Sequence, residues 1–498
     1  MDYDGITNYI GGCWQPARAG KTFTSLNPSR QSDVIGRFSY SEREDITLAV
    51  AAAADAYPEW RRMPMPRRAD VLTRMGHILE ERKEELARFM VREMGKVLLE
   101  ARGDVQEAID MAFYMAAFGR MPNGRVVPSE RPNVFCQAWR VPIGVVGVIT
   151  PWNFPIAIPS WKIFPALLAG NTIVFKPAED TPALATVFTE MLEEAGVPPG
   201  VINLVTGDGP SAGSALVEAE GVSAISFTGS TEVGRQIAAR CGALMKRVSC
   251  ELGGKNAIVV LDDANLDLAL KGVLWSAFGT AGQRCTAASR IIVQESVMAE
   301  YRDRLVAHTT ALRIGDGLDE RNEIGPVVNR KQLDRIHEYV QIGKEEGAEV
   351  LAGGTPLING SLREGCYYAP TIFGNVSPTM RIAQEEIFGP VTALISAENI
   401  QDAIEIANGT AFGLSLSIYT SNIYKAFQAM QELESGLVYV NLPTSGAEIQ
   451  LPFGGIKQTG NGHREAGWMA MDYCTEWKSV YVNYSDSNEL VRAQIDTQ

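Results

Sequence analysis

The sequence predicts an α/β protein with more than one domain. Short apolar runs typical of buried strands alternate with amphipathic helical stretches, and glycine and proline residues separate them. At 498 residues, the chain is longer than one hydrophobic core usually supports. A hydrophobic content of 46% and a charged content of 21% are those of an ordinary globular protein. We therefore expect parallel sheets covered by helices.

Helical periodicity dominates the first part of the chain. Between residues 41 and 119, apolar side chains recur every three or four positions, most regularly in residues 69–83 and 84–94. Residues 120–140 differ, because prolines and a glycine interrupt any helix there and short β-branched runs flank them. We expect a projecting β-hairpin in this segment.

Strands and helices then alternate in two regions. The expected strands of the first region are residues 145–149, 172–175, 201–205, 224–227 and 257–261, with a helix over 186–195. The second region has expected strands over 290–294 and 391–396, and helices over 331–346 and 400–407. Ligands of such sheets bind beyond the carboxyl ends of the strands, and the informative motifs of the first region stand there.

One further strand is expected near the carboxyl terminus. Residues 477–483 (Trp-Lys-Ser-Val-Tyr-Val-Asn) are rich in β-branched and aromatic side chains. Two pairings are open for this strand. It pairs with the hairpin of a neighbouring subunit, or it is an edge strand within its own domain.

Composition excludes several classes of protein. A net charge of −14 and a pI near 5.0 argue against a nucleic-acid binder. No apolar stretch reaches the roughly 18 residues of a membrane span, and no signal peptide is recognisable, so we expect a cytoplasmic protein. The seven cysteines are scattered and suit reduced thiols. The four histidines lack metal-ligand spacing, so no metal site is expected.

A glycine-containing turn is the first candidate for cofactor binding. Residues 229–234 (Gly-Ser-Thr-Glu-Val-Gly) follow an expected strand and open a helix, where backbone N–H groups can hold a pyrophosphate. The alternative is a plain capped helix. Lys176 and Glu179 follow another strand and can hold ribose hydroxyls, or they are solvated surface charges. Since a carboxylate there repels a 2′-phosphate, NAD is expected as cofactor, with NADP as the alternative.

Cys285 is the candidate nucleophile. It stands among small residues that leave room for a substrate, although most cysteines are inert core residues. A thiol must ionise from a pKa of about 8.5, and Arg284, Glu251 or a bound nicotinamide are candidates to promote this. Glu251 opens a Gly-Gly loop, where desolvation raises its pKa towards that of a general base; alternatively it is an exposed strand-end glutamate. Asn153 can donate its amide to an oxyanion, or it is a simple turn residue.

Seven short motifs follow one another along the chain. They are residues 150–155 (Thr-Pro-Trp-Asn-Phe-Pro), 176–179 (Lys-Pro-Ala-Glu), 227–234 (Phe-Thr-Gly-Ser-Thr-Glu-Val-Gly), 251–255 (Glu-Leu-Gly-Gly-Lys), 282–285 (Gly-Gln-Arg-Cys), 385–390 (Glu-Glu-Ile-Phe-Gly-Pro) and 452–455 (Pro-Phe-Gly-Gly). In this order they resemble the aldehyde dehydrogenase superfamily, and the resemblance covers essentially the whole chain.

The resemblance implies a three-part α/β subunit that is aldehyde dehydrogenase-like. Residues 1–119 and 143–254 would form a Rossmann-like NAD-binding domain, and residues 255–458 a second α/β domain that is catalytic. Residues 120–142 and 475–494 would form a small β oligomerisation arm. The implied assembly is a homodimer or homotetramer, and the implied partner is a small-molecule aldehyde.

The resemblance also implies roles for individual residues. The catalytic residues would be Cys285 as nucleophile, Asn153 with the Cys285 N–H as oxyanion hole, and Glu251 as the base for deacylation. The cofactor-binding residues would be Trp152, Lys176, Glu179, Gly209, Gly229, Ser230, Val233, Gly234, Leu252, Glu386 and Phe388. Phe154, Trp161 and Phe453 would line the substrate tunnel. The implied reaction passes a hydride to the cofactor and hydrolyses a cysteine thioester.

Two arginines indicate the substrate class. The patterns around Arg120 and Arg284 look like the antiquitin branch, in which arginines at these patterns bind a distal carboxylate. The alternative is that both are structural ion-pair partners. Residues 451–457 and 460–465 look closer to α-ketoglutaric semialdehyde dehydrogenases, so an acidic semialdehyde of that kind is the expected substrate. Aminoadipic or succinic semialdehyde, or broad specificity, are the alternatives. A cysteine hydrolase would need a histidine partner for Cys285 that no motif supplies.

Overall fold

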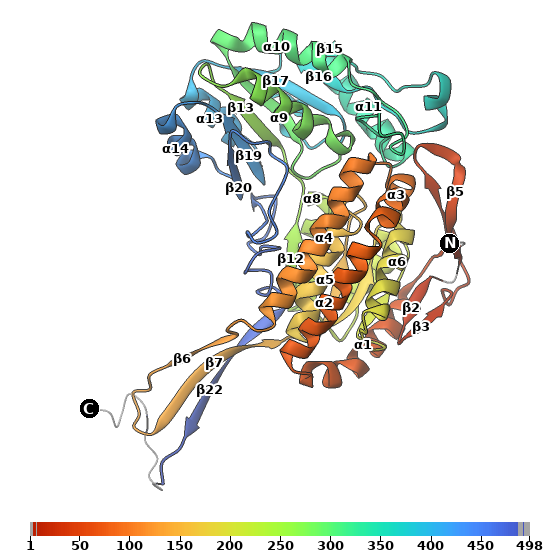
Figure 1. Ribbon diagram of the computed structural model, residues 1–498, viewed down its shortest axis with the longest axis vertical. Coiled ribbons are helices and arrows are strands. Elements are labelled where there is room, and N and C mark those ends of the chain that lie inside the picture. Colours follow the sequence, from red (N-terminus) through yellow and green to blue (C-terminus); the bar gives the residue numbers. More distant parts are fainter. Residues whose placement is uncertain (1–2, 6, 487–491, 493–498) are drawn as a thin grey trace.

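Two seven-stranded sheets form the body of the molecule (Figure 1). The computed structural model describes residues 3–5, 7–486 and 492, so part of the predicted arm segment 475–494 lies outside the described residues. The first sheet has the order β12 (Arg247–Glu251), β11 (Val222–Thr228), β8 (Val145–Ile149), β9 (Thr172–Lys176), β10 (Ile202–Leu204), β2 (Asn8–Ile10) and β3 (Cys13–Gln15). The second has the order β15 (Glu349–Ala352), β16 (Thr371–Gly374), β17 (Val391–Ala397), β14 (Ala288–Gln294), β13 (Asn256–Val260), β19 (Ser415–Tyr419) and β20 (Leu437–Val440).

The first sheet is doubly wound. β12, β11, β8, β9 and β10 are parallel, and the chain first extends the sheet from β8 to β10 and then returns to place β11 on the other side of β8. The strand order therefore reverses between β8 and β11, and the crevice beyond the carboxyl ends of these strands is where such sheets bind nucleotides. The predicted α/β class is confirmed, and the strand order of this sheet is Rossmann-like.

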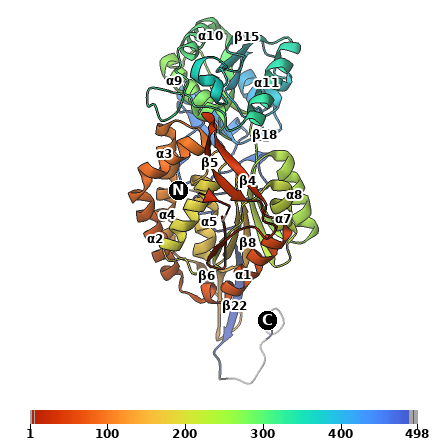
Figure 2. The same cartoon turned by 90° about the vertical axis from the view of Figure 1, so that its right-hand side faces the viewer.

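Both faces of the first sheet are buried because its strands alternate between two cores. Val146 and Val148 of β8 belong to one apolar core, and Val145 and Ile149 to the other. Figure 2 shows helices on each side of the sheet. One side carries α2 (Met65–Glu81), α3 (Lys83–Met94), α4 (Leu98–Phe118), α5 (Ala157–Ala169) and α6 (Pro182–Glu194). The other carries α1 (Arg43–Arg62), α7 (Ser214–Glu218) and α8 (Thr231–Ala243).

The second sheet is parallel except at β15, which runs antiparallel to β16. Its helices are α9 (Leu266–Phe278), α10 (Glu295–Thr310), α11 (Arg330–Glu345), α12 (Arg381–Gln384), α13 (Ile400–Asn408) and α14 (Ile423–Glu432). Most predicted strands and helices are present with shifted ends. The predicted strand 257–261 is β13, and it belongs to this second sheet rather than continuing the first.

The N-terminal strands were not predicted. β2 and β3 add an antiparallel edge to the first sheet, and β1 (Tyr3–Asp4), β5 (Arg30–Ser39) and β4 (Thr22–Asn27) form a separate small sheet. These strands are short or largely polar, so they carry no continuous apolar run. A two-stranded sheet of β18 (Phe412–Gly413) and β21 (Ile456–Lys457) was missed for the same reason.

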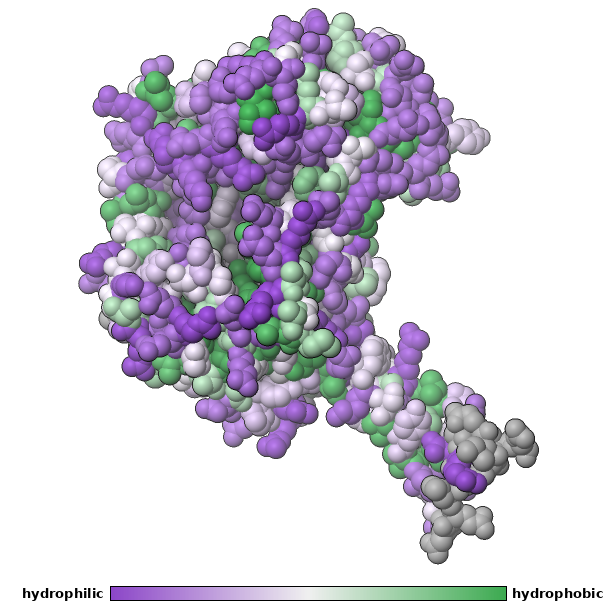
Figure 3. Space-filling view, turned by 180° about the vertical axis from the view of Figure 1, so that it is seen from behind, coloured by the Kyte–Doolittle hydropathy of each residue, from purple (hydrophilic) through white to green (hydrophobic). Residues whose placement is uncertain are grey.

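A three-stranded arm projects from the body (Figure 1). It consists of the predicted hairpin, β6 (Gly124–Val127) and β7 (Val134–Pro142), and of β22 (Thr475–Asn483). β22 pairs antiparallel with β7 of its own chain along its whole length and forms an edge of the arm sheet, as the second of the two interpretations expects. Figure 3 shows the arm standing clear of the body with hydrophobic atoms on its surface. Val126, Trp477 and Tyr481 are exposed by 66%, 48% and 64%, far more than side chains of a folded core.

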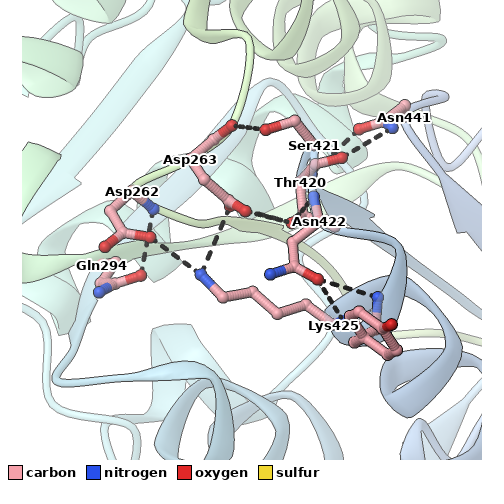
Figure 4. A network of polar contacts seen from close by, with 9 residues as sticks. Asp262, Asp263, Gln294, Thr420, Ser421, Asn422, Lys425 and Asn441 are labelled. Carbon is pink, nitrogen blue, oxygen red and sulfur yellow. Dashed lines mark hydrogen bonds and ion pairs between the residues drawn. The ribbon is translucent and has the colours of Figure 1, made fainter.

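Polar side chains close the carboxyl ends of the second sheet (Figure 4). Lys425 of α14 forms an ion pair at 3.0 Å with Asp262, which follows β13. The Thr420 hydroxyl, after β19, donates to the Asp263 carboxylate at 2.9 Å. Asn422 caps α14 by accepting backbone N–H groups. These contacts attach α14 to the strand ends.

Arg290 ties the second sheet to the loop that follows Glu251. This fully buried side chain of β14 donates to the Lys255 carbonyl at 2.7 and 3.0 Å, and to the Ile406 and Ala407 carbonyls of α13 at 2.8 Å each. The guanidinium therefore satisfies three carbonyl groups that have no water to bind.

Arg290→Met should lower the free energy of unfolding by about 3 kcal/mol or more, because it removes all of these hydrogen bonds from a buried site. Urea denaturation followed by fluorescence measures the change. Arg302→Met, at an exposed arginine paired with the adjacent Asp303, is the control and should change the midpoint little. Equal midpoints for the two variants would contradict this role for Arg290.

Candidate active site

The motifs predicted to carry chemistry converge where the two sheets meet. Asn153 follows β8, Gly229 follows β11 and Glu251 ends β12, so all three lie at the carboxyl ends of the first sheet. Cys285 precedes β14 and therefore lies at the amino end of the second sheet. A cavity of about 350 Å³ at this junction is lined by Cys285, Glu251, Phe154, Trp161, Arg284 and Phe453, among others.

An unusual turn delivers Cys285 to this cavity. The short 3₁₀ segment Gly279–Gly282 precedes it, and Thr280, Ala281 and Gly282 all have positive φ values of 51°, 52° and 68°. Such values are costly for residues with a side chain, so surrounding contacts must hold the turn. A Cβ at Gly282 would lie 2.1 Å from the Gly389 carbonyl oxygen, which explains the glycine.

The environment of the thiol differs from the expected one. Burial, followed by the carboxylates of Glu386 and Glu251, raises the pKa of Cys285 to about 12. Arg284 does not supply the expected positive charge, because its guanidinium pairs with Glu100 at 2.9 Å and lies over the Trp275 ring. A thiol with such a pKa is largely protonated at neutral pH.

Glu251 has the environment expected of a buried base. It is 3% exposed, and neither carboxylate oxygen makes a hydrogen bond of ordinary geometry among the described residues. Burial and the neighbouring Glu465 raise its pKa well above the usual range, while Lys162 and Arg464 oppose the rise. Lys162 itself forms a buried ion pair with Glu465 and donates to the Ser226 hydroxyl at 3.1 Å. The alternative of an exposed strand-end glutamate is therefore wrong.

Asn153 lies against the nucleophile's loop. It is 3% exposed, and its side-chain amide donates to the Gln283 carbonyl at 3.1 Å. An amide nitrogen carries two hydrogens, so this bond leaves one donor for another acceptor. The bond to Gln283 also fixes the amide beside the residues that precede Cys285.

The predicted tunnel residues all line the cavity, but only one of the two predicted substrate-binding arginines does. Trp161 and Phe453 pack edge to face with ring centroids 5.0 Å apart, and Phe154 lies under the Lys96 ammonium at 4.0 Å. Arg284 lines the cavity. Arg120 is exposed after the end of α4 and is not among the residues that line the cavity, so the structure does not bring it to Cys285.

The predicted cofactor residues follow the carboxyl ends of the first sheet. Ser230 caps α8 by accepting the Val233 N–H at 3.4 Å, as the capped-helix interpretation expects, and Gly229 precedes it. The first N–H groups of the helix remain for an anion, because a helix leaves its first four without internal partners. Gly234 is closely packed, since a Cβ there would lie 2.2 Å from a Leu252 methyl group. Gly209 has open space around it and opens a short helical segment after Asp208.

A second group surrounds the place expected for nicotinamide. Glu386 accepts the Gly254 N–H at 3.0 Å, and a Cβ at Gly253 would lie 2.3 Å from its carboxylate. Trp152 and Phe388 meet edge to face with centroids 5.5 Å apart. Phe388 has a positive φ of 59°, a strained value for an aromatic residue.

Lys176 and Glu179 lie at the end of β9. Lys176 is 3% exposed and lies 3.5 Å from the Glu179 carboxylate, whose side chain is 51% exposed. Burial lowers the pKa of Lys176, and Glu179, Asp208 and Asp180 oppose this. A buried ammonium beside an accessible carboxylate fits a ribose, which offers hydroxyl acceptors and donors.

Several residues of the cavity were missed. Glu100, Asp104 and Glu107 of α4 line it, as does Glu465. The spacing of the three α4 carboxylates is a helical face that the sequence could have revealed. Nothing local connects Lys162 with Glu465, which are 303 residues apart.

The described residues give no indication of other site types. Among them, no cluster of His, Cys, Asp and Glu side chains could hold a metal ion. No helix in the described part combines the length and the apolar character needed to cross a bilayer. All seven cysteines are free thiols.

Comparisons with known proteins agree with the geometry. The model of the aldehyde dehydrogenase family matches residues 14–480. An α-ketoglutaric semialdehyde dehydrogenase of Bacillus subtilis is 44% identical over 95% of this chain and 97% of that protein. An α-ketoglutarate semialdehyde dehydrogenase of Haloferax volcanii is 41% identical over 97% of this chain and 100% of that protein. Betaine aldehyde dehydrogenase from Staphylococcus aureus, solved with NAD⁺, superposes with a TM-score of 0.95 at 33% identity and covers 98% of this chain and 96% of its own.

The raised thiol pKa can be measured by alkylation. In the cofactor-free protein, the rate of Cys285 modification by iodoacetamide should rise throughout pH 7–10 without a plateau, because the thiolate is the reactive form. Glu386→Gln should accelerate modification severalfold at each pH, since removing a negative charge lowers the thiol pKa. Timed quenching and mass spectrometry of the Cys285 peptide measure both rates.

Glu385→Gln is the matched control, because Glu385 is adjacent but paired with Arg381 at 2.9 Å. A plateau below pH 9 in the unmodified sequence would show that the thiol ionises readily and would contradict the raised pKa.

Proposed function

The chain belongs to the aldehyde dehydrogenase family, and from that premise we propose that it oxidises an acidic semialdehyde to the corresponding acid with NAD⁺, through a thioester on Cys285. The observation that carries the proposal is that Cys285 and Glu251 line one cavity, with the Asn153 amide fixed beside the nucleophile's loop. A nucleophile, a base and an oxyanion donor are the groups that this chemistry requires.

Acylation begins with the thiol. A thiol with a pKa near 12 does not ionise unaided at neutral pH, so its proton must pass to a base as the sulfur attacks the aldehyde carbon. Water that enters the cavity can take this proton, so acylation does not depend on Glu251. The Asn153 amide and the Cys285 N–H then stabilise the oxyanion, and donors so placed are typically worth about 3 kcal/mol or more.

Residues around Gly229–Gly234, Lys176 and Glu386 would hold NAD⁺, whose nicotinamide would accept the hydride when bound. The exposed N-terminus of α8 offers N–H groups for the pyrophosphate. Trp152, Leu252 and Phe388 give apolar walls near the nicotinamide end. Gly209 leaves open space for the adenosine end.

Deacylation needs an activated water. The raised pKa of Glu251 makes its carboxylate a stronger base than an exposed glutamate, so it can take a proton from water that attacks the thioester. The proton then has a polar route inward, because Glu465 and Lys162 adjoin Glu251. Glu251 therefore favours water over a thiol acceptor for the acyl group.

The substrate class rests on relatives and on charge. Two relatives named for α-ketoglutaric or α-ketoglutarate semialdehyde are 44% and 41% identical. Arg284 is the cationic residue on the cavity wall, although its ion pair with Glu100 reduces the positive charge available to a substrate carboxylate. Aminoadipic and succinic semialdehyde remain the alternatives. A cysteine hydrolase is disfavoured, because none of the described residues that line the cavity is a histidine.

The proposal also assigns a role to each domain and an oligomeric state to the protein. We assign cofactor binding to residues 1–119 and 143–254, which contain the first sheet, and catalysis to residues 255–458, which contain the second. The projecting arm, residues 120–142 with 475–486, presents exposed Val126, Trp477 and Tyr481 to a neighbouring subunit of a homodimer or homotetramer. A cytoplasmic location is proposed from the sequence alone.

Two substitutions separate the chemical steps. Cys285→Ser should abolish NADH formation, because the hydroxyl cannot form the thioester at neutral pH. Glu251→Gln should keep a first-turnover burst of NADH and lower steady turnover by about 10²–10⁴-fold. Stopped-flow absorbance of NADH measures burst and steady rate.

Cys13→Ser, at an exposed cysteine outside the cavity, is the control and should behave as the unaltered protein. Normal steady turnover by Glu251→Gln would remove the deacylation role from Glu251. A panel of neutral and carboxylated aldehydes, assayed in the same way, tests the substrate class.

Coenzyme choice should follow the carboxylates near Lys176. Glu179, Asp180 and Asp208 all influence this lysine, and a 2′-phosphate placed there would meet negative charge. We expect kcat/KM to be higher with NAD⁺ than with NADP⁺, and Glu179→Gln should raise kcat/KM for NADP⁺ by roughly 3–10-fold. Exposed Glu220 lies outside this group, and Glu220→Gln should leave the ratio unchanged. An NADP⁺ preference in the unaltered protein would refute the assignment.

A further inference from the structure

One carboxyl group on the cavity wall has no role in the proposed mechanism. Glu107 lies on α4, seven residues after Glu100 and three after Asp104, so the three side chains share the helix face that lines the cavity. Of the described charged residues that line this cavity, only Glu107 and Glu251 lack an ion-pair partner.

The other two carboxylates of this face have structural partners. Glu100 pairs with Arg284 at 2.9 Å and accepts the Thr280 N–H at 2.9 Å. Asp104 pairs with buried Lys96 at 2.8 Å, and its second oxygen accepts the Ala157 N–H at 2.8 Å. Both carboxylates are thereby compensated, and they are not available to bind a ligand without breaking these contacts.

Glu107 has neither a hydrogen bond nor an ion pair within the described part of the chain, and it is partly exposed to the cavity. Charged or titratable groups approach it from α4 itself, from the α3–α4 turn, from the nucleophile's loop and from β20. They are Asp104, Asp110, Lys96, Arg284 and Tyr439. Burial, with a further contribution from Asp104, raises the pKa of Glu107 to about 8, while Lys96 and Arg284 oppose the rise.

Arg284 contributes a neighbouring donor. Its Nε donates to the Thr280 hydroxyl at 3.0 Å and its Nη2 to Glu100 at 2.9 Å. No hydrogen bond from Nη1 occurs among the described residues. Both N–H groups of Nη1 are therefore left for a carboxylate that reaches this part of the cavity, where the Glu107 carboxyl group also lies.

We propose that Glu107, in its neutral form, is a specificity-determining residue that donates a hydrogen bond from its carboxyl O–H to the distal carboxylate of the substrate. This role rests on the proposed oxidation of an acidic semialdehyde. A neutral carboxylic acid is a good donor to a carboxylate, whereas an ionised Glu107 would repel it. The same position thus attracts the substrate at neutral pH and disfavours it in alkaline solution.

The test compares two five-carbon aldehydes, 5-oxopentanoate and pentanal, which differ in the distal carboxylate. The measured quantity is the ratio of their kcat/KM values with NAD⁺ between pH 6.5 and 9.5. Since both aldehydes use the same Cys285 and Glu251, the titration of these groups cancels in the ratio. The carboxylate of 5-oxopentanoate is ionised over the whole range.

In the unaltered protein, kcat/KM should be higher for 5-oxopentanoate than for pentanal below pH 8. The ratio of the two values should fall about tenfold above pH 8, because Glu107 then ionises. Glu107→Gln keeps an N–H donor that cannot ionise, so its ratio should be independent of pH. Glu107→Ala should show a ratio about tenfold lower at pH 7, also independent of pH. Glu81→Gln, at an exposed carboxylate of α2 that is not among the groups around Glu107, should keep the ratio and its pH dependence within about twofold.

Two outcomes would contradict the proposal, and they are distinguishable. A preference for 5-oxopentanoate that is equal in the unaltered protein and in both Glu107 variants would overturn this role and leave the proposed substrate class intact. A ratio near one in the unaltered protein at every pH would overturn both the role of Glu107 and the proposed substrate class. Oxidation of pentanal by each variant reports that it is folded, and Glu107→Gln keeps the size of the side chain if Glu107→Ala fails to fold.

Discussion

The short connection between the two sheets is the constraint on which the rest of the structure depends. Glu251 is the last residue of β12 and Asn256 the first of β13, so only residues 252–255 separate these strands of the first and second sheets. This link brings the carboxyl ends of one sheet to the amino ends of the other. Glu251 lies at the junction because of its place in the chain. The link also needs a residue without a side chain at position 254, since a Cβ at Gly254 would lie 2.8 Å from the Cys285 carbonyl oxygen.

Charge compensation around the junction determines what the cavity can do. Arg284 with Glu100, Lys96 with Asp104 and Lys162 with Glu465 are ion pairs with nearly inaccessible side chains. Removing one member of such a pair costs more than removing both, because it leaves a buried charge without a partner. The pairs therefore hold α4, the nucleophile's loop and α5 in place.

Much of this arrangement could be predicted from the sequence, and the missing parts have a common physical cause. β8 and β9 were found because strands buried on both faces are continuous apolar runs. Cys285, Glu251 and Asn153 were found because each stands in a local motif. The bond of Arg284 to Glu100 joins residues 184 positions apart, and no local pattern reports it. The direction of the Cys285 pKa shift was missed for the same reason, since burial raises this pKa first and Glu386, distant in the sequence, raises it further.

The two sheets also show why the rule for ligand sites in α/β proteins applies here to only one of them. The rule places ligands at the carboxyl ends of parallel strands, and the first sheet obeys it with Lys176, Gly229 and Glu251. In the second sheet, those ends are closed by Lys425 bound to Asp262 and by Thr420 bound to Asp263 (Figure 4). The charged and hydroxyl groups there are engaged with one another. The second sheet instead contributes its amino ends, where the loop before β14 carries Cys285 to the bases and donors of the first.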